Sequence, residues 1–527
     1  MARAVDYSLY LVTDSTPAIL GDRDLVQVVE AALEGGVTIV QYRDKLSDTA
    51  VLVSTAKRLH AVTKKHNVPL LINDRIDVAL AVGCEGVHIG QDDLDLPSAR
   101  RLLGKDAIIG VTVSSIDEAQ TACKDGADYL GIGTLFATAT KTNTKDVIGT
   151  AGTRQILEAI STAGKNVRTV CIGGINASTV QRVIFQSFHP SKSLDGVAIV
   201  SAIIAAQDPA QASKDLLKLV KTPPPFFTEA GSADSRSSDI KDAEKLSKLV
   251  KAAAEVVQRV GEKTPLSHNM TNLVVQNFAA NVALAVGGSP IMANYGEEAA
   301  DLAKLGGSLV INMGTVTPDG LTNYTKALKA YNLAGGSVVF DPVGGGATSV
   351  RRNAIKTLMA AGYFDVIKGN EGEISTVSGT MVQQRGVDSG PSTSTFTEKA
   401  TLVRDLALRE RNVVVMTGAT DIISDGSRTL AVKNGHELLG RITGSGCVLG
   451  TTISIMLAVS KEDKLVATLA ALLHYEIAAE IAAARSDVRG PGTFVPALID
   501  ELYNIHKAAE ANDSSWLERA KVEAVIL

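Results

Sequence analysis

Cysteine pairs and a strong charge imbalance are missing from this sequence, and no targeting segment is expected. The four cysteines, Cys84, Cys123, Cys171 and Cys447, form no Cys-x-x-Cys pair, which argues against a zinc site or a disulfide framework. A net charge of -5 leaves no basic footprint for nucleic acid. We therefore expect a protein of a reducing compartment, the cytoplasm, that does not bind nucleic acid.

Leader and membrane segments are not expected either. The first residues, Met-Ala-Arg-Ala-Val-Asp-Tyr, lack the apolar core of a secretory signal and include an acid that is unusual in transit peptides. The most apolar late stretch, residues 466–484, contains His474, Glu476 and Glu480, whose burial in lipid would be costly. We interpret this stretch as a core helix and expect no membrane contact.

The chain is long enough for two hydrophobic cores. A length of 527 residues exceeds what one core serves, and 45% hydrophobic with 21% charged residues is ordinary for globular proteins. Residues 221–239 combine three consecutive prolines with a Gly, Ser, Asp and Ala run that has too little apolar surface to fold. We predict a first domain at 1–220, a linker at 221–239 and a second domain at 240–527.

Strand-like and helix-like segments alternate eight times in the first domain. The β-rich runs are residues 8–14, 38–45, 69–74, 86–91, 107–114, 129–135, 167–175 and 196–202. Eight repeats of a βα unit predict an α/β fold of the (β/α)8 TIM barrel type. Its chemistry should lie at the C-terminal ends of the strands.

Polar side chains occur at those strand ends. Strand alternation places Gln41, Arg43 and Lys45 on one face at the mouth of the barrel. Such a cluster suits a polyphosphate, although solvated charges at a strand end are the alternative. Asp74 and Asp93 follow the third and fourth strands, and carboxylates at neighbouring strand ends are ligands for Mg²⁺.

The later strands end in hydroxyls and glycines. The sixth strand runs into residues 133–141, a loop rich in hydroxyls with one lysine. Residues 172–175, Ile-Gly-Gly-Ile, and the pair Val200-Ser201 end the last two strands, where barrels commonly hold phosphate through backbone N–H groups. His88 alone is more often a packed barrel histidine than a catalyst. Two anion sites are predicted, one cationic and metal-binding, the other built on glycine.

These motifs resemble those of thiamine phosphate synthase over nearly all of residues 5–220. They are Gln-x-Arg-x-Lys, Asn-Asp-Arg, His-x-Gly-Gln-x-Asp, Thr-x-Thr-Lys, Ile-Gly-Gly-Ile and Val-Ser-Ala-Ile, in this order. The resemblance implies that an aminopyrimidine pyrophosphate is condensed with a thiazole phosphate. The residues it implies for the pyrimidine pyrophosphate are Gln41, Arg43, Lys45, Asn73, Thr112 and Lys141. Those for the thiazole phosphate are Thr138, Thr140, Gly174, Val200 and Ser201, and those for Mg²⁺ are Asp74 and Asp93.

The residues accommodate this chemistry. A pyrophosphate held by a metal ion and two cations is a stabilised leaving group, so the C–O bond can break before the thiazole nitrogen attacks. No side-chain nucleophile is needed. The sequence departs from the family at Thr112, where a serine is usual, and in the loop that begins at Gly133, where Gly-Pro is usual.

The second domain has a different alternation, after a charged amphipathic helix expected at 240–262. Strand-like runs lie at residues 289–293, 308–313, 337–341, 365–368 and 412–417. About five parallel strands with long helices favour an open doubly wound sheet, with ligands at the strand carboxyl ends. No Walker lysine loop is present.

A glycine loop and two acids suggest the chemistry of this domain. Residues 443–447, Thr-Gly-Ser-Gly-Cys, precede a helical run at 448–460, so N–H groups at a helix N-terminus would form an anion hole. A mere turn is the alternative for this loop alone. Together with Asp341 after a strand and Glu373 within Asn-x-x-Glu, it predicts a kinase that uses magnesium and a nucleotide.

Residues 245–510 resemble the ribokinase-like superfamily and, within it, hydroxyethylthiazole kinase. The narrower match rests on Asn-Met-Thr-Asn, Pro-Ile-Met-Ala, Asp-Pro-Val-Gly-x-Gly-Ala and a cysteine where sugar kinases place an aspartate base. The resemblance implies a thiazole pocket at Asn272, Met292 and Gly314, although core packing is the alternative for Met292. It implies ATP at Lys368, Thr417 and Gly444, and Mg²⁺ at Asp341 and Glu373.

The resemblance also implies that Cys447 lies beside the accepting hydroxyl, and we expect it to act as general base. Because the thiol follows a glycine loop at a helix N-terminus, its pKa is expected below the free value of about 8.5. Lys368 stands where arginine is common in the family, which puts bidentate phosphate contact in doubt. The family further implies a homo-oligomer, a trimer or a hexamer, with kinase sites between subunits.

The sequence leaves three hypotheses for the whole chain. In the first, the second domain makes hydroxyethylthiazole phosphate from the alcohol and ATP, and the first domain couples it to hydroxymethylpyrimidine pyrophosphate. In the second, a phosphate-binding barrel isomerase is joined to a pyrimidine or sugar kinase, but such isomerases do not need the metal and pyrophosphate groups Arg43, Lys45, Asp74 and Asp93. In the third, the chain is a catalytically silent sensor of thiamine precursors, which the intact motifs disfavour.

Overall fold

The structure, a computed structural model, describes residues 5–136, 147–164, 167–227, 243–380 and 394–527. The chain divides into two compact units, Met1–Pro224 and Pro225–Leu527. Each unit has a hydrophobic core of its own, so each is described separately below.

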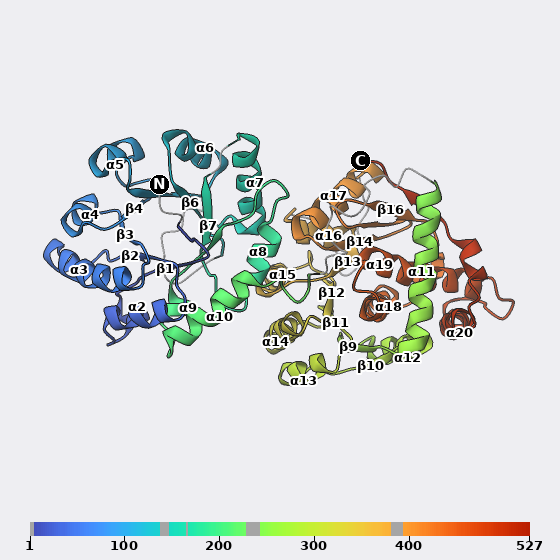
Figure 1. The fold of residues 1–527 in the computed structure, drawn as a ribbon. Helices are drawn as coiled ribbons and strands as arrows, with labels where there is room; N and C mark the ends of the chain where they lie inside the picture. Colours follow the sequence, from blue (N-terminus) through green and yellow to red (C-terminus); the bar gives the residue numbers. More distant parts are fainter. Residues whose placement is uncertain (1–4, 137–146, 165–166, 228–242, 381–393) are drawn as a thin grey trace. The chain divides into compact units, whose positions relative to one another are not determined.

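The first unit is a closed barrel of eight parallel strands (Figure 1). The strands are β1 (Leu9–Val12), β2 (Ile39–Tyr42), β3 (Leu70–Asn73), β4 (Gly86–Ile89), β5 (Ile108–Val113), β6 (Tyr129–Ile132), β7 (Arg168–Ile172) and β8 (Gly196–Ile199). Each strand pairs with the next, and β1 closes the ring against β8, with Leu9 opposite Val197. The predicted barrel is confirmed, with each strand inside its expected run.

Helices between the strands cover the outside of the barrel. They are α1 (Pro17–Leu20), α2 (Leu25–Glu34), α3 (Thr49–Lys65), α4 (Ile76–Val82), α5 (Leu96–Leu103), α6 (Ile116–Asp125), α7 (Gly149–Thr162), α8 (Val180–Ser187), α9 (Ser201–Ile204) and α10 (Pro209–Lys221). Their apolar faces and the outward-facing strand residues form the main core. A smaller cluster fills the barrel interior and includes the rings of Tyr7, Tyr10 and Tyr129.

The second unit is built on a nine-stranded mixed sheet of order β10-β9-β11-β12-β13-β14-β15-β16-β17. Its strands are β9 (Leu266–Met270), β10 (Ser289–Ile291), β11 (Ser308–Asn312), β12 (Ser337–Asp341), β13 (Val366–Asn370), β14 (Val413–Thr417), β15 (Asp421–Ser424), β16 (Thr429–Val432) and β17 (Val522–Ala524). The strands from β10 to β14 run parallel, and β15, β16 and β17 are added antiparallel. The carboxyl ends of the parallel strands therefore meet at one edge, where ligands bind in such sheets.

Helices cover both faces of this sheet (Figure 1). One layer contains α13 (Ala299–Lys304), α14 (Pro318–Ala334), α15 (Ser349–Ala361), α16 (Glu371–Ser378) and α17 (Phe396–Glu410). The other contains α11 (Ala243–Lys263), α12 (Gln276–Ala285), α18 (Ser445–Val459), α19 (Lys464–Ala483) and α20 (Pro491–Glu510). Strand residues alternate between the layers: Val310 and Val339 pack with the second, Leu309 and Val338 with the first.

The sheet has more strands than the five parallel candidates predicted from the sequence. Strand β9 reads Leu-Ser-His-Asn-Met and carries polar side chains that are nonetheless fully buried. His268 bonds through Nε2 to the carbonyl of Ala293 at 2.8 Å, and its Nδ1 has no partner among the described residues. The other two are satisfied inside the core, because Ser267 bonds to Ser454 at 2.5 Å and Thr451 donates to Asn269 at 2.8 Å. Since these partners lie on α18, the strand has no apolar alternation that a sequence could reveal.

Helix α19 is long and apolar enough to cross a membrane, but 89% of its apolar window is buried inside this unit. Its glutamates and histidine lie on a helix that packs against α11, α18 and α20. The sequence-based prediction of a core helix in this stretch is confirmed.

The predicted linker starts with described residues. Lys221 is the last residue of α10, and Gln181 of the barrel donates to the carbonyl oxygens of Thr222 and Pro223 at 3.2 and 3.4 Å. Phe226 already belongs to the second unit, where its ring stacks on Tyr363 at 4.6 Å. Residues 228–242 lie outside the described part of the chain, so the linker at 221–239 stays a prediction.

Candidate active sites

The mouth of the barrel encloses a cavity of about 620 Å³ at the carboxyl ends of the strands. Most described residues that the sequence predicts for the two anion sites line it. They are Gln41, Arg43, Lys45, Asn73, Asp93, Thr112, Gly174, Val200 and Ser201. The barrel thus brings together residues that are up to 160 positions apart in the sequence. Thr138, Thr140 and Lys141 lie outside the described residues.

Asp74 and Asp93 face one another beside this cavity. Burial, and then the negative charge of Asp93, raise the pKa of Asp74, whereas Lys45 opposes the shift. Asp93 also accepts a hydrogen bond from the N–H of Gly90 at 2.7 Å. Two carboxylates in contact favour a cation between them, and Mg²⁺ commonly takes one or two carboxylates together with substrate phosphates. The donor set therefore fits Mg²⁺.

Arg43 is oriented by an acid that none of the sequence motifs includes. Its guanidinium lies 3.8 Å from Asp14, whose side chain is 4% exposed. Asp14 is itself fixed, because the N–H and the hydroxyl of Thr16 donate to it at 2.9 and 2.6 Å. Asp14 is the last residue of the first predicted strand run, 8–14. This position at a strand end is the one feature of the sequence that could have indicated a role for Asp14 in the site.

A chain of hydrogen bonds lies below the cavity inside the barrel. Gln41 donates to the hydroxyl of Tyr10 at 2.8 Å, and that hydroxyl bonds to Tyr129 at 2.7 Å. His88 joins Tyr129 through Nδ1 at 2.8 Å and Thr112 through Nε2 at 2.7 Å. Both ring nitrogens of His88 are thus engaged within the barrel, which orients Gln41 and Thr112 toward the cavity.

The glycine-based part of the cavity requires residues without a side chain. Gly173 and Gly174 have φ angles of 116° and 66°, which L side chains rarely adopt. A Cβ on Gly173 would lie 2.5 Å from Cγ2 of Thr134. Val200 is the N-cap of α9, which starts at Ser201, so this end of the cavity is formed mainly by backbone.

A second chain of polar contacts crosses the sheet edge of the other unit. Asn272 donates to Asn312 at 3.0 Å, and Asn312 donates to Asp341 at 2.8 Å. The same oxygen of Asp341 lies 3.1 Å from the ammonium of Lys368, which donates to the carbonyl of Gly446 at 2.8 Å. This series of polar contacts joins the ends of β11, β12 and β13 to the first turn of α18. Asn312 falls within the expected strand run 308–313, which gave no sign that it bridges Asn272 and Asp341.

The acids of this site fit a magnesium ion. Asp341 is fully buried, and its Oδ1 atom has no hydrogen-bond partner among the described residues. Glu373 is more occupied, because its oxygens accept from the N–H groups of Gly344 and Asn370, both at 2.8 Å. Burial and the charge of Asp341 raise the pKa of Glu373 to about 7. Asp341 therefore has a free oxygen for a metal, and Glu373 adds negative charge behind it. Within the described chain, no cluster of three or more acidic, histidine or cysteine side chains is available for a metal.

The expectation of a lowered Cys447 pKa is wrong. Cys447 is the third residue of α18, with its sulfur 3.5 Å from Nδ2 of Asn272. Burial, and next the negative charge of Asp341, raise the pKa of the Cys447 thiol to about 11, although Lys368 opposes this. Desolvation and a neighbouring carboxylate outweigh the helix N-terminus. The thiol is protonated at neutral pH.

Two of the three predicted thiazole residues, Asn272 and Gly314, are in contact. Gly314 packs on Asn272, since a Cβ there would lie 2.6 Å from Cβ of Asn272. Arg351, which no sequence motif includes, donates to the carbonyl oxygens of Met313 and Gly314 at 2.8 and 2.9 Å and so holds this loop. Met292 is partly buried against the core of the second layer.

The predicted ATP residues lie on adjacent segments. Thr417 ends β14 opposite Asn370 of β13. Gly444 is the N-cap of α18 with a φ of 86°, and a Cβ there would lie 2.3 Å from Val275. Only glycine fits at that turn, which leads directly into the helix N-terminus that faces Lys368.

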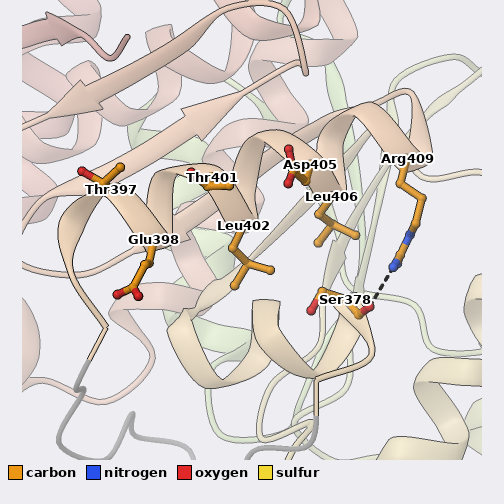
Figure 2. A pocket seen from close by; sticks show the side chains of 8 residues that line it. All are labelled: Ser378, Thr397, Glu398, Thr401, Leu402, Asp405, Leu406 and Arg409. Atoms are coloured by element: carbon orange, nitrogen blue, oxygen red, sulfur yellow. Dashed lines mark hydrogen bonds between the residues drawn. The ribbon is translucent and has the colours of Figure 1, made fainter. Parts of the chain in front are cut away.

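Another hollow, of about 490 Å³, lies along the outer surface of α17. Figure 2 shows its lining residues, which are Ser378, Thr397, Glu398, Thr401, Leu402, Asp405, Leu406 and Arg409. Arg409 crosses it to donate to the carbonyl of Ser378 at 2.7 Å. None of the predicted site residues line this hollow, so it is separate from both sites.

Comparison with known families divides the chain at the same place as the fold. Residues 9–203 match the thiamine monophosphate synthase family, and residues 257–508 match the hydroxyethylthiazole kinase family. The residues of both candidate sites lie within the matched ranges.

Relatives with both halves are found among fungi. The chain is 45% identical over 529 residues to the probable thiamine biosynthetic bifunctional enzyme of Schizosaccharomyces pombe, which covers 99% of both chains. It is 37% identical over 549 residues to the thiamine biosynthetic bifunctional enzyme of Saccharomyces cerevisiae, covering 98% of this chain and 99% of that one. The hydroxyethylthiazole kinase of Moorella thermoacetica is 46% identical over 248 residues, which is 47% of this chain and 91% of that one.

Proposed function

Because the chain belongs to the family of bifunctional thiamine biosynthetic enzymes, with a thiamine phosphate synthase fused to a hydroxyethylthiazole kinase, we propose specific roles for the residues of its two sites. The chain carries both activities. The kinase half uses ATP. The roles proposed below assign the substrates and the metal to atoms of this chain.

In the barrel, we assign the pyrimidine pyrophosphate to the cationic side of the cavity. Arg43 and Lys45 bind the pyrophosphate, and Lys141 adds a third cation. Gln41, Asn73 and Thr112 orient the pyrimidine, since Gln41 and Thr112 are held by the interior hydrogen bonds. Gly174, Val200 and Ser201 hold the thiazole phosphate at the other side of the cavity, and the family resemblance assigns Thr138 and Thr140 to the same phosphate.

These positions explain why no nucleophilic side chain is required. The cations withdraw charge from the leaving pyrophosphate as the bond to the pyrimidine methylene breaks. The thiazole is fixed by its phosphate and presents its nitrogen to the cationic methylene. Because both reactants are bound in the same cavity, their reaction does not require an encounter in solution. The observation that carries this assignment is the single cavity lined by residues from β2 to β8.

In the kinase unit, Asn272 and Gly314 bind the thiazole alcohol, with Met292 as an apolar wall. Lys368 and the first turn of α18 stabilise the transferring phosphoryl group, and Thr417 and Gly444 bind the rest of ATP. Asp341 and Glu373 would hold Mg²⁺ here, as Asp74 and Asp93 would in the barrel, and the ion would neutralise phosphate charge in both reactions.

Cys447 contacts the accepting hydroxyl as a neutral thiol in this assignment. Its raised pKa makes proton abstraction before phosphoryl transfer unfavourable. Phosphoryl transfer depends chiefly on positioning and charge stabilisation, so the hydroxyl proton passes late, as the new O–P bond forms, to an oxygen of the transferred phosphoryl group, with Cys447 as a hydrogen-bonding neighbour.

We further propose that the enzyme is a homo-oligomer, a trimer or a hexamer, of the cytoplasm. Leu273 and Val274, which directly follow Asn272, are 70% and 73% exposed, and Leu284 is 60% exposed. Apolar side chains so exposed beside a binding residue favour a subunit contact there. The described cysteines are all free thiols, in keeping with a reducing compartment.

A pair of variants tests the assignments. Arg43→Met should raise the KM of the synthase for the pyrimidine pyrophosphate by at least about tenfold, the value of one charge-assisted hydrogen bond, and leave the kinase unchanged. Lys368→Met should abolish thiazole phosphorylation and leave condensation of supplied thiazole phosphate unchanged. Loss of both activities in either variant would contradict the separation of the sites.

A further inference from the structure

Two buried acids in the kinase unit have no role in the steps above. Asp421 begins β15 and is 8% exposed, and Glu476 lies on α19 and is 4% exposed. Neither carboxyl oxygen of Glu476 accepts a hydrogen bond from a donor within the described part of the chain. Burial and the charge of Asp421 raise the pKa of Glu476 well above its usual value. Two buried carboxylates in contact cannot both stay charged, so the pair holds a proton.

The pair lies beneath the loop that connects β14 to β15. Asp421 accepts a hydrogen bond from the N–H of Gly418 at 2.8 Å. Gly418 is exposed and directly follows Thr417, which we place in the ATP site. The ladder between β14 and β15 ends at the pair Met416–Ile422, and this hydrogen bond continues it into the loop, so Asp421 helps to hold Gly418 next to Thr417.

Helix α19 contacts a second loop on the same side of the unit. Gly435, in the loop after β16, passes over Glu476, since a Cβ on this glycine would lie 3.8 Å from Cγ of Glu476. One turn further along the helix, Glu480 accepts from the N–H of Gly435 at 3.2 Å and from Asn434 at 3.1 Å. The two acids of α19 therefore contact the loop before β15, through Asp421, and the loop after β16.

The position of the shared proton can be derived from these contacts. Asp421 already accepts the N–H of Gly418, which favours its ionised form, whereas Glu476 accepts no bond from a donor. Burial raises the pKa of Asp421 to about 6, and the pKa of Glu476 is raised further. A proton on Glu476 turns two competing acceptors into a donor and an acceptor, and leaves the other oxygen of Asp421 for Gly418.

We propose that Glu476 is a positioning residue of the kinase, which donates its carboxyl proton to Asp421 and thereby fixes the Gly418 loop for ATP. The inference rests on the placement of ATP at Thr417 and Gly444. Glu476 itself touches neither substrate, and its effect is confined to the nucleotide side of the site.

The charged groups around Asp421 and Glu476 influence the pH at which Glu476 loses the shared proton. Glu480 of the same helix and the charge on Asp421 disfavour ionisation of Glu476, and Lys368 of β13 favours the ionised form of Asp421. Lys521 pairs with Glu480 at 2.9 Å. When the pH rises far enough for Glu476 to lose its proton, two carboxylates repel each other and the Gly418 loop is released, so ATP binding weakens in alkaline solution.

Steady-state kinetics of full-length variants test the proposal. Glu476→Leu should raise the KM for ATP by about 10- to 100-fold, as expected for a buried charged group that loses its donor, with little change in the KM for the thiazole alcohol. Glu476→Gln keeps a donor that cannot ionise, so it should retain most of the parental ATP affinity and lose the alkaline rise in KM. Glu255→Gln, an exposed glutamate of α11, is the matched control and should behave as the parent.

Three results would decide against the proposal. An unchanged KM for ATP in Glu476→Leu would overturn it, and so would equal increases for both substrates, which indicate general loss of structure. If Glu476→Leu does not fold, the pH profile of Glu476→Gln decides, and an alkaline rise identical to that of the parent rejects the shared proton. Gly444→Ala tests the placement of ATP independently of Glu476. If this variant leaves the KM for ATP unchanged, the nucleotide placement itself is wrong.

Discussion

Removing the buried ion pair between Asp341 and Lys368 should affect stability and activity differently, depending on whether one partner or both are replaced. The two side chains are 1% and 4% exposed, and their charged atoms lie 3.1 Å apart. Removing one partner leaves the other charge buried without a counter-charge, which costs about 3–5 kcal/mol. Asp341→Asn and Lys368→Met should each lower the free energy of unfolding by about this amount.

The double variant separates charge burial from packing. Asp341→Asn combined with Lys368→Met has no buried charge at these two positions, and the asparagine still accepts from Asn312. Replacement of a buried ion pair by uncharged groups is often neutral or even stabilising by about 1–4 kcal/mol. The double variant should therefore be more stable than either single variant, although all three should lack kinase activity.

The chain provides a direct probe for this measurement. Its single tryptophan, Trp516, is 7% exposed and packs in the core of the kinase unit. Tryptophan fluorescence during urea unfolding therefore reports the kinase unit alone, with the shift in midpoint giving the change in stability. Lys304→Met is the control, because the pair between Lys304 and Asp301 is 73% and 85% exposed and is worth at most about 1 kcal/mol.

Two outcomes would refute this reasoning. If the double variant is as unstable as the weaker single variant, packing rather than charge burial determines the cost. If the double variant phosphorylates the thiazole alcohol at the parental rate, the ion pair has no part in catalysis. The predicted combination, recovered stability without recovered activity, indicates that the pair is retained for function.

Further predictions concern the metal, the thiol and the start of the kinase unit. Asp74→Asn and Asp93→Asn should each raise the Mg²⁺ concentration needed for half-maximal synthase rate far more than the KM for thiazole phosphate, because amides ligate Mg²⁺ weakly; unchanged metal titrations would remove both residues from the metal site. Since the Cys447 thiol is protonated at neutral pH, Cys447→Ala should keep ATP affinity and lose less than about 10²-fold in kinase rate, below the usual range for a general base, and Cys447→Asp should exceed alanine; a larger loss in alanine would restore the base assignment. Phe226→Ala should lower the free energy of unfolding of the kinase unit by about 3 kcal/mol, as its buried ring stacks on Tyr363; an unchanged fluorescence midpoint would show that this contact adds nothing.

The barrel was predictable because its polar residues sit at strand ends in a repeated unit. Strand β2 ends at Tyr42, so Arg43 and Lys45 follow the strand instead of alternating along it as predicted, and Asp74 and Asp93 follow β3 and β4. Their order after successive strands is still enough to place them at the mouth. The partners that orient them were not predictable. Asp14 meets Arg43 only after the first two strands pair.

The kinase site shows where local reasoning fails. The position of Cys447 at a helix N-terminus suggested a low pKa, but its burial and the approach of Asp341 come from the fold and have the opposite sign. The polar strand β9 carries no apolar alternation, because its partners are hydroxyls of α18. Asp421 and Glu476 are 55 positions apart in the sequence, so only the fold makes them a pair.

The central claim is that one chain contains two separate sites that act in sequence. It is tested most directly by incubating full-length enzyme with hydroxyethylthiazole, ATP, Mg²⁺ and hydroxymethylpyrimidine pyrophosphate, and by measuring each product by mass in the parent, Asp93→Asn and Asp341→Asn. The parent should form thiamine phosphate. Asp93→Asn should accumulate thiazole phosphate, and Asp341→Asn should form thiamine phosphate only when thiazole phosphate is supplied. Thiamine phosphate formed from the alcohol by both variants, or supplied thiazole phosphate left unused by Asp341→Asn, would contradict the claim.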